Sequence, residues 1–365
     1  MKIGLFIGRF SPVHLGHINT INKMLLENDK VIIAIGSLSS AFSTKKILTA
    51  NETMCIFRDI FPSSSLDINY GLNENITFIH LYDNLYNDLD WATNIRLNVQ
   101  QVICHQYCHK EQYTVNLYGY NKDYTSKYLN WFPHYKLIEG KPFLVDGKIV
   151  NATDIREYLF NNLQADKQTV ETYLNKLMPT VATSALINIV NTNFDRFIKL
   201  KEEYDTYKKY KDAWANAPYP PVFVTGDAVV FCNGHVLVIK RKFNPGKSLM
   251  ALPGGFINQN ETIKECILRE LKEETKINVP PNKLSNSVRA IETFDAPNRS
   301  LRGRTITHAG VILLRDESCL PRVTAADDAI SASWLPIEYL DTKRSEFFED
   351  HYHIIKNLLK YYQEV

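Results

Sequence analysis

The stretch KIGLFIGRFSPVHLGH, residues 2–17, indicates how the chain begins to fold. Its apolar half predicts a strand that ends at Gly8, and a helix is predicted to begin at about Leu15. The N-terminal N–H groups of that helix point at the end of the strand, where the backbone can approach a ligand because Gly8 has no side chain. The stretch therefore predicts an anion-binding site at the carboxyl end of a strand.

Two histidines, His14 and His17, lie three residues apart on the first predicted helical turn. Both project from one face of the helix, so both can donate to phosphate oxygens. A zinc site would need at least a third ligand, and the flanking residues offer no obvious one. Phosphate recognition is the interpretation that we favour, while a metal site and a purely structural pair of histidines stay open.

Two different patterns divide the chain. Up to about residue 160, apolar runs such as KIGLFIG, VIIAIG and ITFIHLY alternate with helix-length segments, which is the βαβ pattern of a parallel sheet covered on both faces. Residues 184–214 form one amphipathic stretch that predicts a helical connector ending at APYPP. Strand-like segments resume after Pro221. We expect a first domain over residues 1–180, a helical linker over 181–220 and a second domain over 221–365.

Composition and charge exclude several classes of partner. A chain of 365 residues with 45% hydrophobic content can bury two cores. Its 42 basic and 40 acidic residues leave a net charge of +2, so we expect neither nucleic acid nor a membrane as partner. Without a signal peptide or a run of about 18 apolar residues, the sequence predicts a soluble cytoplasmic protein and leaves the oligomeric state open, a homo-oligomer included. The scattered cysteines are typical of reduced thiols: Cys55, Cys104, Cys108, Cys232, Cys266 and Cys319.

The first domain resembles a known family. GRFSPVHLGH matches the HxGH element of nucleotidylyltransferases, and IGSLSSAFSTKKILTANE (35–52), Trp91 in LDWATNI and NATDIR (151–156) are similar to the archaeal-type nicotinamide mononucleotide (NMN) adenylyltransferases. The resemblance implies a Rossmann-like α/β domain that transfers AMP from ATP to NMN, giving NAD and pyrophosphate. In the late motif Asn151 stands where the family usually has serine, but Thr153 and Arg156 remain, so we expect the anion site to survive.

The resemblance also implies roles for individual residues. The phosphate of NMN attacks the α-phosphorus of ATP in line, which requires positioning and charge neutralisation but no covalent nucleophile. His17 is assigned to the α-phosphate, His14 and Arg156 to the outer phosphates, with Arg9 and Mg²⁺ assisting. Trp91 is expected to stack on the cationic nicotinamide ring, although plain core packing is nearly as good an interpretation. The predicted substrate-binding residues of this domain are Gly8, Arg9, Phe10, Trp91 and Thr153.

A cysteine and histidine cluster, CHQYCHK at residues 104–110, is interpreted as structural. Four ligands cannot converge on one metal from a single helix, and the two pairs of residues point in different directions around it.

A stripe of carboxylates marks the second domain, in GGFINQNETIKECILRELKEET at residues 254–275. Glu270, Glu273 and Glu274 lie at helical positions i, i+3 and i+4, so three like charges share one face. Such crowding calls for a cation, and Mg²⁺ or Mn²⁺ suits carboxylate oxygens best. A surface helix with spare glutamates is the alternative.

The spacing of this segment is similar to the Nudix box. The resemblance implies an α+β domain, with a mixed sheet between helices, that hydrolyses nucleoside diphosphates linked to another moiety. Glu270, Glu273 and Glu274 are the implied metal ligands, and Gly255, Glu261 and Arg269 support the box. Lys276 replaces its closing glycine, which costs about 1 kcal/mol if the turn keeps a left-handed shape.

The substrate of the second domain is suggested by ETFDAPNRSLRGRTITHAGVILL, residues 292–314, which resembles a segment of ADP-ribose pyrophosphatases. Arg299, Arg302 and Arg304 are expected to meet a diphosphate or ribose phosphate, with a solvated loop as an equal alternative. The sequence thus predicts a bifunctional enzyme of NAD metabolism whose partners are ATP, NMN, NAD and ADP-ribose, with Mg²⁺ or Mn²⁺ as cofactor.

Two other functions remain open from the sequence. The Nudix domain would act as a catalytically weak ADP-ribose sensor that regulates the first domain. Alternatively, the first domain would adenylylate another phosphorylated vitamin, such as phosphopantetheine or flavin mononucleotide; Trp91 and the segment 35–52 argue against this.

Overall fold

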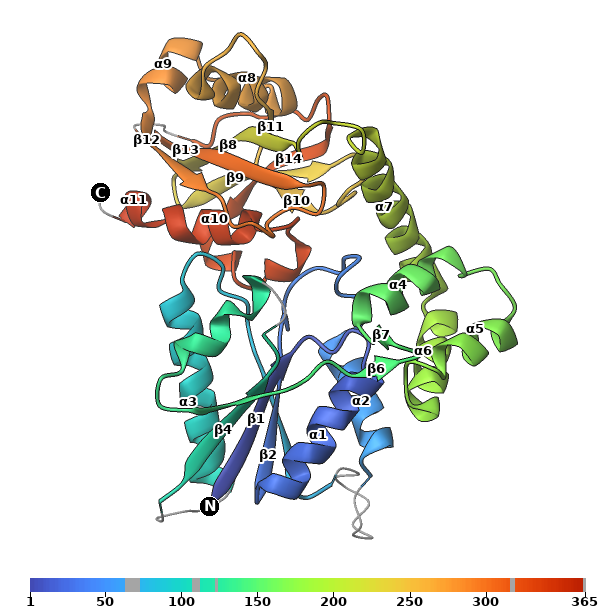
Figure 1. Cartoon of the computed structure of the whole chain (residues 1–365). Coiled ribbons are helices and arrows are strands. Elements are labelled where there is room, and N and C mark those ends of the chain that lie inside the picture. The colour runs from blue at the N-terminus through green and yellow to red at the C-terminus, as the bar shows by residue number, and fades with distance from the viewer. Residues whose placement is uncertain (63–72, 107–111, 122–123, 316–318, 364–365) are drawn as a thin grey trace. The chain divides into compact units, whose positions relative to one another are not determined.

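The computed structural model describes the chain except for residues 63–72, 107–111, 122–123, 316–318 and 364–365 (Figure 1). The chain forms two compact units, Met1–Lys201 and Glu202–Val365, called here the first and second unit. Part of the CHQYCHK cluster, including Cys108 and His109, lies outside the described residues. Among the helices that the structure describes, none is long and apolar enough to cross a membrane.

The first unit contains a five-stranded sheet with the order β3-β2-β1-β4-β5 in which all neighbours are parallel. The chain leaves the middle of this sheet in one direction after β1 and in the other after β3, so the order reverses at β1. Ligands bind at such a switch point, beyond the carboxyl ends of the strands, and the GRFSPVHLGH loop follows β1. The strands are β1 (Lys2–Gly8), β2 (Lys30–Ile35), β3 (Ile76–His80), β4 (Thr114–Gly119) and β5 (Lys136–Glu139).

Helices cover both faces of this sheet (Figure 1). Alternate residues of β1, including Leu5, are buried in one cluster with α3 side chains such as Ile95. On the other face α1 approaches closely because Gly4 has no side chain: a Cβ there would lie 3.0 Å from Met24 Cε. These helices are α1 (Leu15–Glu27), α2 (Ala50–Ile60), α3 (Asp88–Gln106) and the 3₁₀ helix η1 (Tyr124–Trp131).

The remainder of the first unit is mostly helical. A hairpin, β6 (Leu144–Val145) and β7 (Lys148–Ile149), precedes α4 (Ala152–Asn161), α5 (Lys167–Leu174) and α6 (Thr180–Thr192), and α6 packs against α2. The α/β class with a parallel sheet is confirmed.

The predicted connector is two helices rather than one continuous helix. It breaks at Asn193, whose backbone N–H and side-chain amide both bond to Ile189 O at 3.0 Å, because asparagine competes with the backbone for helical hydrogen bonds. The second helix, α7 (Phe194–Ala213), begins in the first unit and continues into the second. The predicted domain boundaries at residues 180 and 221 stay a prediction.

The second unit has a mixed sheet with the order β10-β9-β8-β13-β12, in which β8 and β13 are parallel. The long strand β8 pairs with β9 at its carboxyl end and with β11 around Asp227, while β14 pairs with β9. The neighbour of β8 therefore changes along the strand: β11 pairs with it around Asp227, and β9 pairs with it at the carboxyl end. The strands are β8 (Val222–Cys232), β9 (His235–Arg241), β10 (Met250–Ala251), β11 (Gly254–Phe256), β12 (Val288–Phe294), β13 (Arg304–Leu314) and β14 (Ala329–Pro336).

Helices lie on both faces of this sheet as well. Ile267 and Leu271 of α8 pack on β8 residues such as Val230. Phe231, which points to the other face, contacts Tyr362 of the C-terminal helices with ring centroids 5.4 Å apart. The predicted α+β class with a mixed sheet is confirmed. The helices are α8 (Ile263–Thr275), α9 (Pro281–Asn286), α10 (His351–Leu358) and α11 (Lys360–Gln363), with 3₁₀ turns η2 (Ile337–Tyr339) and η3 (Arg344–Glu346).

Candidate functional sites

Hydrogen bonds join the loop after β1 to the loop after β2. Gly36 donates to Gly8 O at 2.9 Å, and Ser11 Oγ accepts from the N–H groups of Ile47 at 3.0 Å and Leu48 at 3.3 Å. Gly8 also leaves space inside the protein: a Cβ there would lie 2.9 Å from Phe10 Cζ. The space that glycine leaves is filled by an aromatic ring of the same loop.

Phe10, predicted to bind substrate, is an internal residue. Its side chain is 2% exposed and its φ of 49° turns the chain sharply. The ring makes edge contacts with His17, Phe6 and Phe57 at centroid distances of 4.9, 5.3 and 5.2 Å. Phe10 thus holds the imidazole of His17 in place and presents little surface to a ligand.

The two histidines of the loop are stacked, with ring centroids 3.6 Å apart. His17 Nδ1 accepts a hydrogen bond from the backbone N–H of His14 at 3.2 Å. Burial, and next the neighbouring His14, lower the pKa of His17 well below its ordinary value. A neutral imidazole whose Nδ1 is an acceptor carries its proton on Nε2, so His17 is a donor through Nε2 at pH 7.

Arg156, near the start of α4, reaches the same loop from 145 residues away in the sequence. It donates to Ser11 O at 2.9 Å and to Thr153 Oγ1 at 3.2 Å. Asn151, which departs from the family pattern, caps α4 by accepting from Asp154 N at 3.0 Å. Burial, followed by repulsion from the exposed Arg9, lowers the pKa of Arg156 to about 10. A bound anion would offset both effects, which suits a phosphate site.

Trp91 is half-buried in a cluster of aromatic rings beside this site. Its ring meets the rings of Tyr128 and Trp131 edge-on, each at 5.7 Å, and packs against the core. Tyr128 in turn donates to Ile7 O, near the carboxyl end of β1, at 3.4 Å. The cluster is therefore attached to the end of β1, and both interpretations of Trp91, stacking and packing, are compatible with its position.

Lys46 belongs to this region and was not found by sequence reasoning. Its ammonium donates to Ser40 O at 2.6 Å and to Leu38 O at 3.2 Å, which closes the loop after β2. Burial lowers its pKa to about 8, opposed by Asp83. In the sequence it is one of two adjacent lysines in a polar loop, and nothing there distinguishes it from its neighbour.

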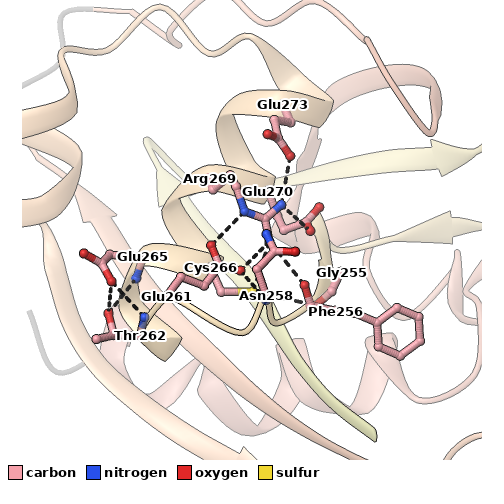
Figure 2. Close-up of polar contacts among 10 residues, drawn as sticks. All are labelled: Gly255, Phe256, Asn258, Glu261, Thr262, Glu265, Cys266, Arg269, Glu270 and Glu273. Carbon is pink, nitrogen blue, oxygen red and sulfur yellow. Dashed lines mark hydrogen bonds and ion pairs between the residues drawn. The ribbon is translucent and has the colours of Figure 1, made fainter.

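The second site is organised by Arg269 of α8 (Figure 2). Its guanidinium donates to both carboxylate oxygens of Glu261, at 2.8 and 2.6 Å, and to Glu270 at 2.7 Å and Glu273 at 2.9 Å. The hydrogen bonds from Arg269 lower the pKa of Glu261 to about 2. A fifth bond, to Phe256 O at 3.2 Å, ties the helix to β11.

The glycine pair on β11 leaves room for two carboxylates. A Cβ on Gly255 would overlap the Glu270 carboxylate, and one on Gly254 would overlap Oδ1 of Asp227. Gly254 N donates to Glu274 Oε2 at 3.0 Å. Asp227, which sequence reasoning missed, is buried in the middle of β8 and accepts a hydrogen bond from Thr307. An aspartate inside an otherwise apolar strand was the available signal.

Burial and mutual repulsion perturb these carboxylates. Glu274 is 4% exposed, and burial raises its pKa to about 8, with Glu270 contributing. Burial likewise raises the pKa of Glu270 and of Asp227. A divalent cation would stabilise the charged forms, so Glu270 and Glu274 fit a metal site.

The three glutamates of the predicted stripe do not gather at one point. The side chain of Glu273 is 43% exposed and turns to Arg269, whereas Glu274 is buried against Gly254. Among the described residues, no group of three or more His, Cys, Asp or Glu side chains is arranged to hold a metal. The same observation leaves His14 and His17 without a third metal ligand among those residues.

The three arginines of the segment 292–314 have different surroundings. Arg299 was expected to meet the substrate. Instead it forms a buried ion pair with Asp350 through two hydrogen bonds of 2.8 Å. Arg304 donates to the carbonyl of Asp295 in its own loop. Arg302 lies over the ring of Phe256, 5.3 Å from its centroid, and only this arginine of the three lies beside β11.

Lys276 ends α8 in the left-handed conformation that the missing glycine would have adopted. Its φ and ψ are 43° and 35°, and its N–H bonds to Lys272 O at 3.0 Å. The substitution therefore leaves the shape of the helix end intact.

Comparison with known proteins identifies a family for each part of the chain. Residues 5–105 match the cytidylyltransferase-like family and residues 223–358 match the NUDIX domain family. The chain is 30% identical over 175 residues to an ADP-ribose pyrophosphatase of Methanocaldococcus jannaschii, covering 48% of this chain and 90% of that protein. It is 30% identical over 153 residues to a nicotinamide/nicotinic acid mononucleotide adenylyltransferase of Acinetobacter baylyi, covering 42% and 72%.

Solved structures resemble the whole chain. Among them is a bifunctional NMN adenylyltransferase/ADP-ribose pyrophosphatase from Francisella tularensis in complex with AMP and a manganese ion, with a TM-score of 0.83 and 31% identity over 99% of each chain. The fold and sites thus define an enzyme in which a nucleotidyltransferase unit is fused to a Nudix unit. The chain belongs to the family of bifunctional NMN adenylyltransferase/ADP-ribose pyrophosphatases.

Proposed function

We propose that the first unit transfers AMP from ATP to NMN. The observation that carries this is the convergence of His17 and Arg156 on one loop at the switch point of the sheet. A phosphate oxygen of NMN attacks the α-phosphorus, the bond to the β-phosphate oxygen breaks, and pyrophosphate leaves. His17 donates from Nε2 to the α-phosphate, while His14, Arg9 and Arg156 balance charge on the outer phosphates.

We propose that the second unit hydrolyses ADP-ribose to AMP and ribose 5-phosphate. Glu270 and Glu274 hold the divalent cation, for which we propose Mg²⁺, with Mn²⁺ as the alternative; when bound, it activates water and offsets charge on the diphosphate. Water adds to one phosphorus and the bridging P–O bond breaks. Arg269 orients Glu270, and the N–H of Gly254 orients Glu274.

A working hydrolase has better support than a sensor. Lys276 was the reason in the sequence to expect a weak enzyme. However, α8 ends at this residue in the left-handed conformation, and Glu274, two residues earlier, accepts a hydrogen bond from Gly254 N. We also propose a cytoplasmic location, since Cys55, Cys104, Cys266 and Cys319 are free thiols.

The test is product identification. The protein is incubated with ATP, NMN and Mg²⁺, and separately with ADP-ribose and either Mg²⁺ or Mn²⁺, and products are identified by mass spectrometry. We expect NAD with pyrophosphate, and AMP with ribose 5-phosphate. Adenylylation of phosphopantetheine or flavin mononucleotide in preference to NMN would contradict the first assignment. Binding of ADP-ribose without release of AMP, with either metal, would contradict the second.

A further inference from the structure

Arg241, at the end of β9, is an arginine with unused donors. Its Nε donates to Pro245 O at 2.8 Å, and its guanidinium lies 4.4 Å from the centroid of the Phe348 ring. Within the described part of the chain, these contacts hold the guanidinium in place while its two terminal nitrogens make no hydrogen bond or ion pair. A half-buried guanidinium in this state has donors to offer to a ligand.

Arg302 is a second guanidinium in the same neighbourhood. Its side chain is 14% exposed, its Nε donates to Ser300 Oγ at 3.2 Å, and the ring of Phe256 lies beneath it. Its carboxylate partner, Glu349, is 3.7 Å away, which is too far for a hydrogen bond. Arg302 is therefore oriented by an aromatic ring and only loosely neutralised.

Contacts with adjacent residues bring the two arginines into one neighbourhood: Arg241 lies over the ring of Phe348, and Arg302 lies 3.7 Å from the carboxylate of Glu349. The pKa of Arg241 is lowered by burial and then by repulsion from Arg302, and is raised by Glu349 and Glu274. The charges of Arg302 and of Glu274 thus both act on Arg241. An anion between two guanidinium groups relieves their repulsion.

Arg299 shows what a structural arginine looks like in this region. It makes two bonds of 2.8 Å to Asp350, and both side chains are almost completely buried. Neither Arg241 nor Arg302 has such a partner. The difference argues against a purely structural role for this pair.

We propose that Arg241 and Arg302 form a binding site for the diphosphate group of the substrate, beside Glu274. This inference rests on the proposed hydrolase function of the second unit and names the chemistry that it recognises, a diphosphate ester. Arg241, which the sequence did not single out, takes the place in substrate binding that was expected of Arg299. Arg302 keeps the role expected of it.

The experiment measures Arg241→Gln, Arg241→Lys and the control Arg289→Gln, which changes an exposed arginine on β12. Two constants are taken from the hydrolysis reaction: KM for ADP-ribose, and Ki for inorganic pyrophosphate as a competitor. We expect Arg241→Gln to raise both by about 10- to 100-fold, as for loss of charge-assisted hydrogen bonds. Arg241→Lys should raise both several-fold, because an ammonium cannot donate in a fork. Arg289→Gln should change neither.

Three results would overturn the site. One is an unchanged Ki for pyrophosphate in Arg241→Gln while KM rises, because this would indicate a packing role. The second result applies if Arg241→Gln fails to fold: a Ki for pyrophosphate in Arg241→Lys that equals the Ki of the parent. If the parent does not hydrolyse ADP-ribose, the proposed function itself fails. In that case Arg241 is tested by equilibrium dialysis of ADP-ribose, with a saturating non-hydrolysable ATP analogue to occupy the first site. The third overturning result is an equal affinity of the parent and Arg241→Gln for ADP-ribose.

Discussion

Each of the two sites contains a pair of arginines that repel each other, but the charges around the two pairs differ. In the first unit Arg9 repels Arg156, and burial and repulsion lower the pKa of both Arg156 and His17. In the second unit Arg302 repels Arg241, but burial raises the pKa of the nearby Glu274 to about 8. The first set of shifts would be reversed by an anion alone. The second set requires a cation for the carboxylates and an anion for the arginines.

This difference indicates how each site binds a nucleotide phosphate. A site built from histidines, backbone and arginines binds phosphate directly, so a metal ion would only assist there. A site built from buried carboxylates repels phosphate until a divalent cation is present. Substitutions in the two units test this contrast.

The largest effect is expected for Glu274→Gln, which removes a charged oxygen ligand with little change in volume. Loss of several kcal/mol of metal-dependent stabilisation corresponds to at least about a thousandfold fall in ADP-ribose hydrolysis. NAD synthesis, measured in the same preparation, should be unchanged. Retention of parental hydrolysis at saturating Mg²⁺ and Mn²⁺ would remove Glu274 from the metal site.

The matching change in the first site is His17→Ala. Removing one preorganised phosphate donor typically costs about 3 kcal/mol, so NAD formation should fall by about a hundredfold or more. Hydrolysis of ADP-ribose serves as the control and should not change. Synthesis within a few-fold of the parent would show that His17 does not contact the reacting phosphates.

Trp91→Ala tests whether the aromatic cluster contributes to the first site. Loss of stacking on a cationic ring should raise KM for NMN about tenfold and leave KM for ATP nearly unchanged. Trp131→Ala, in the same cluster, is the control for packing. Equal increases for both substrates, or equal effects of the two variants, would indicate a core role for Trp91.

The crowded charges of the second unit should make its stability depend on pH. Burial raises the pKa of Glu203, in α7, to about 7 from an ordinary value of 4.5. The folded protein therefore binds a proton that the unfolded chain lacks between these values, so the free energy of unfolding should fall as pH rises from about 5 to 7 and then level off. Urea titrations of Glu203→Gln should show a shallower fall over this range. An identical pH profile in parent and variant would rule out Glu203 as the source.

The smallest effect is expected for Lys276→Gly. Glycine adopts the left-handed conformation without the penalty of a Cβ, so the free energy of unfolding should rise by about 1 kcal/mol. Turnover of ADP-ribose should stay the same, because the ligand Glu274 is already in place. A marked rise in turnover would instead mean that the helix end limits the hydrolase.

Local patterns in the sequence predicted the fold of the first unit, and the resemblance to the Nudix box implied that of the second. Alternating strands and helices predicted the parallel sheet, and the order reversal at β1 places the GRFSPVHLGH loop where such a sheet binds ligands. The spacing of Glu261, Arg269 and Glu270 lies within one helix and its preceding loop, so their contacts follow from local geometry. The same holds for the end of α8 at Lys276.

Contacts between distant segments decided the rest. Arg299 and Arg302 look alike in the sequence, but a buried Asp350 takes one and leaves the other beside β11. Glu273 and Glu274 are adjacent, yet only Glu274 reaches the N–H of Gly254. Arg241 and Lys46 have no local signature, since burial and neighbours from other strands and loops create their properties. The sequence by itself predicted the two fold classes, the two motifs and the kind of chemistry, because these follow from spacing along the chain and from the resemblance of the motifs to known families. Only the tertiary structure decided which charges are paired inside the protein and which remain for a ligand, because pairing depends on distance in space.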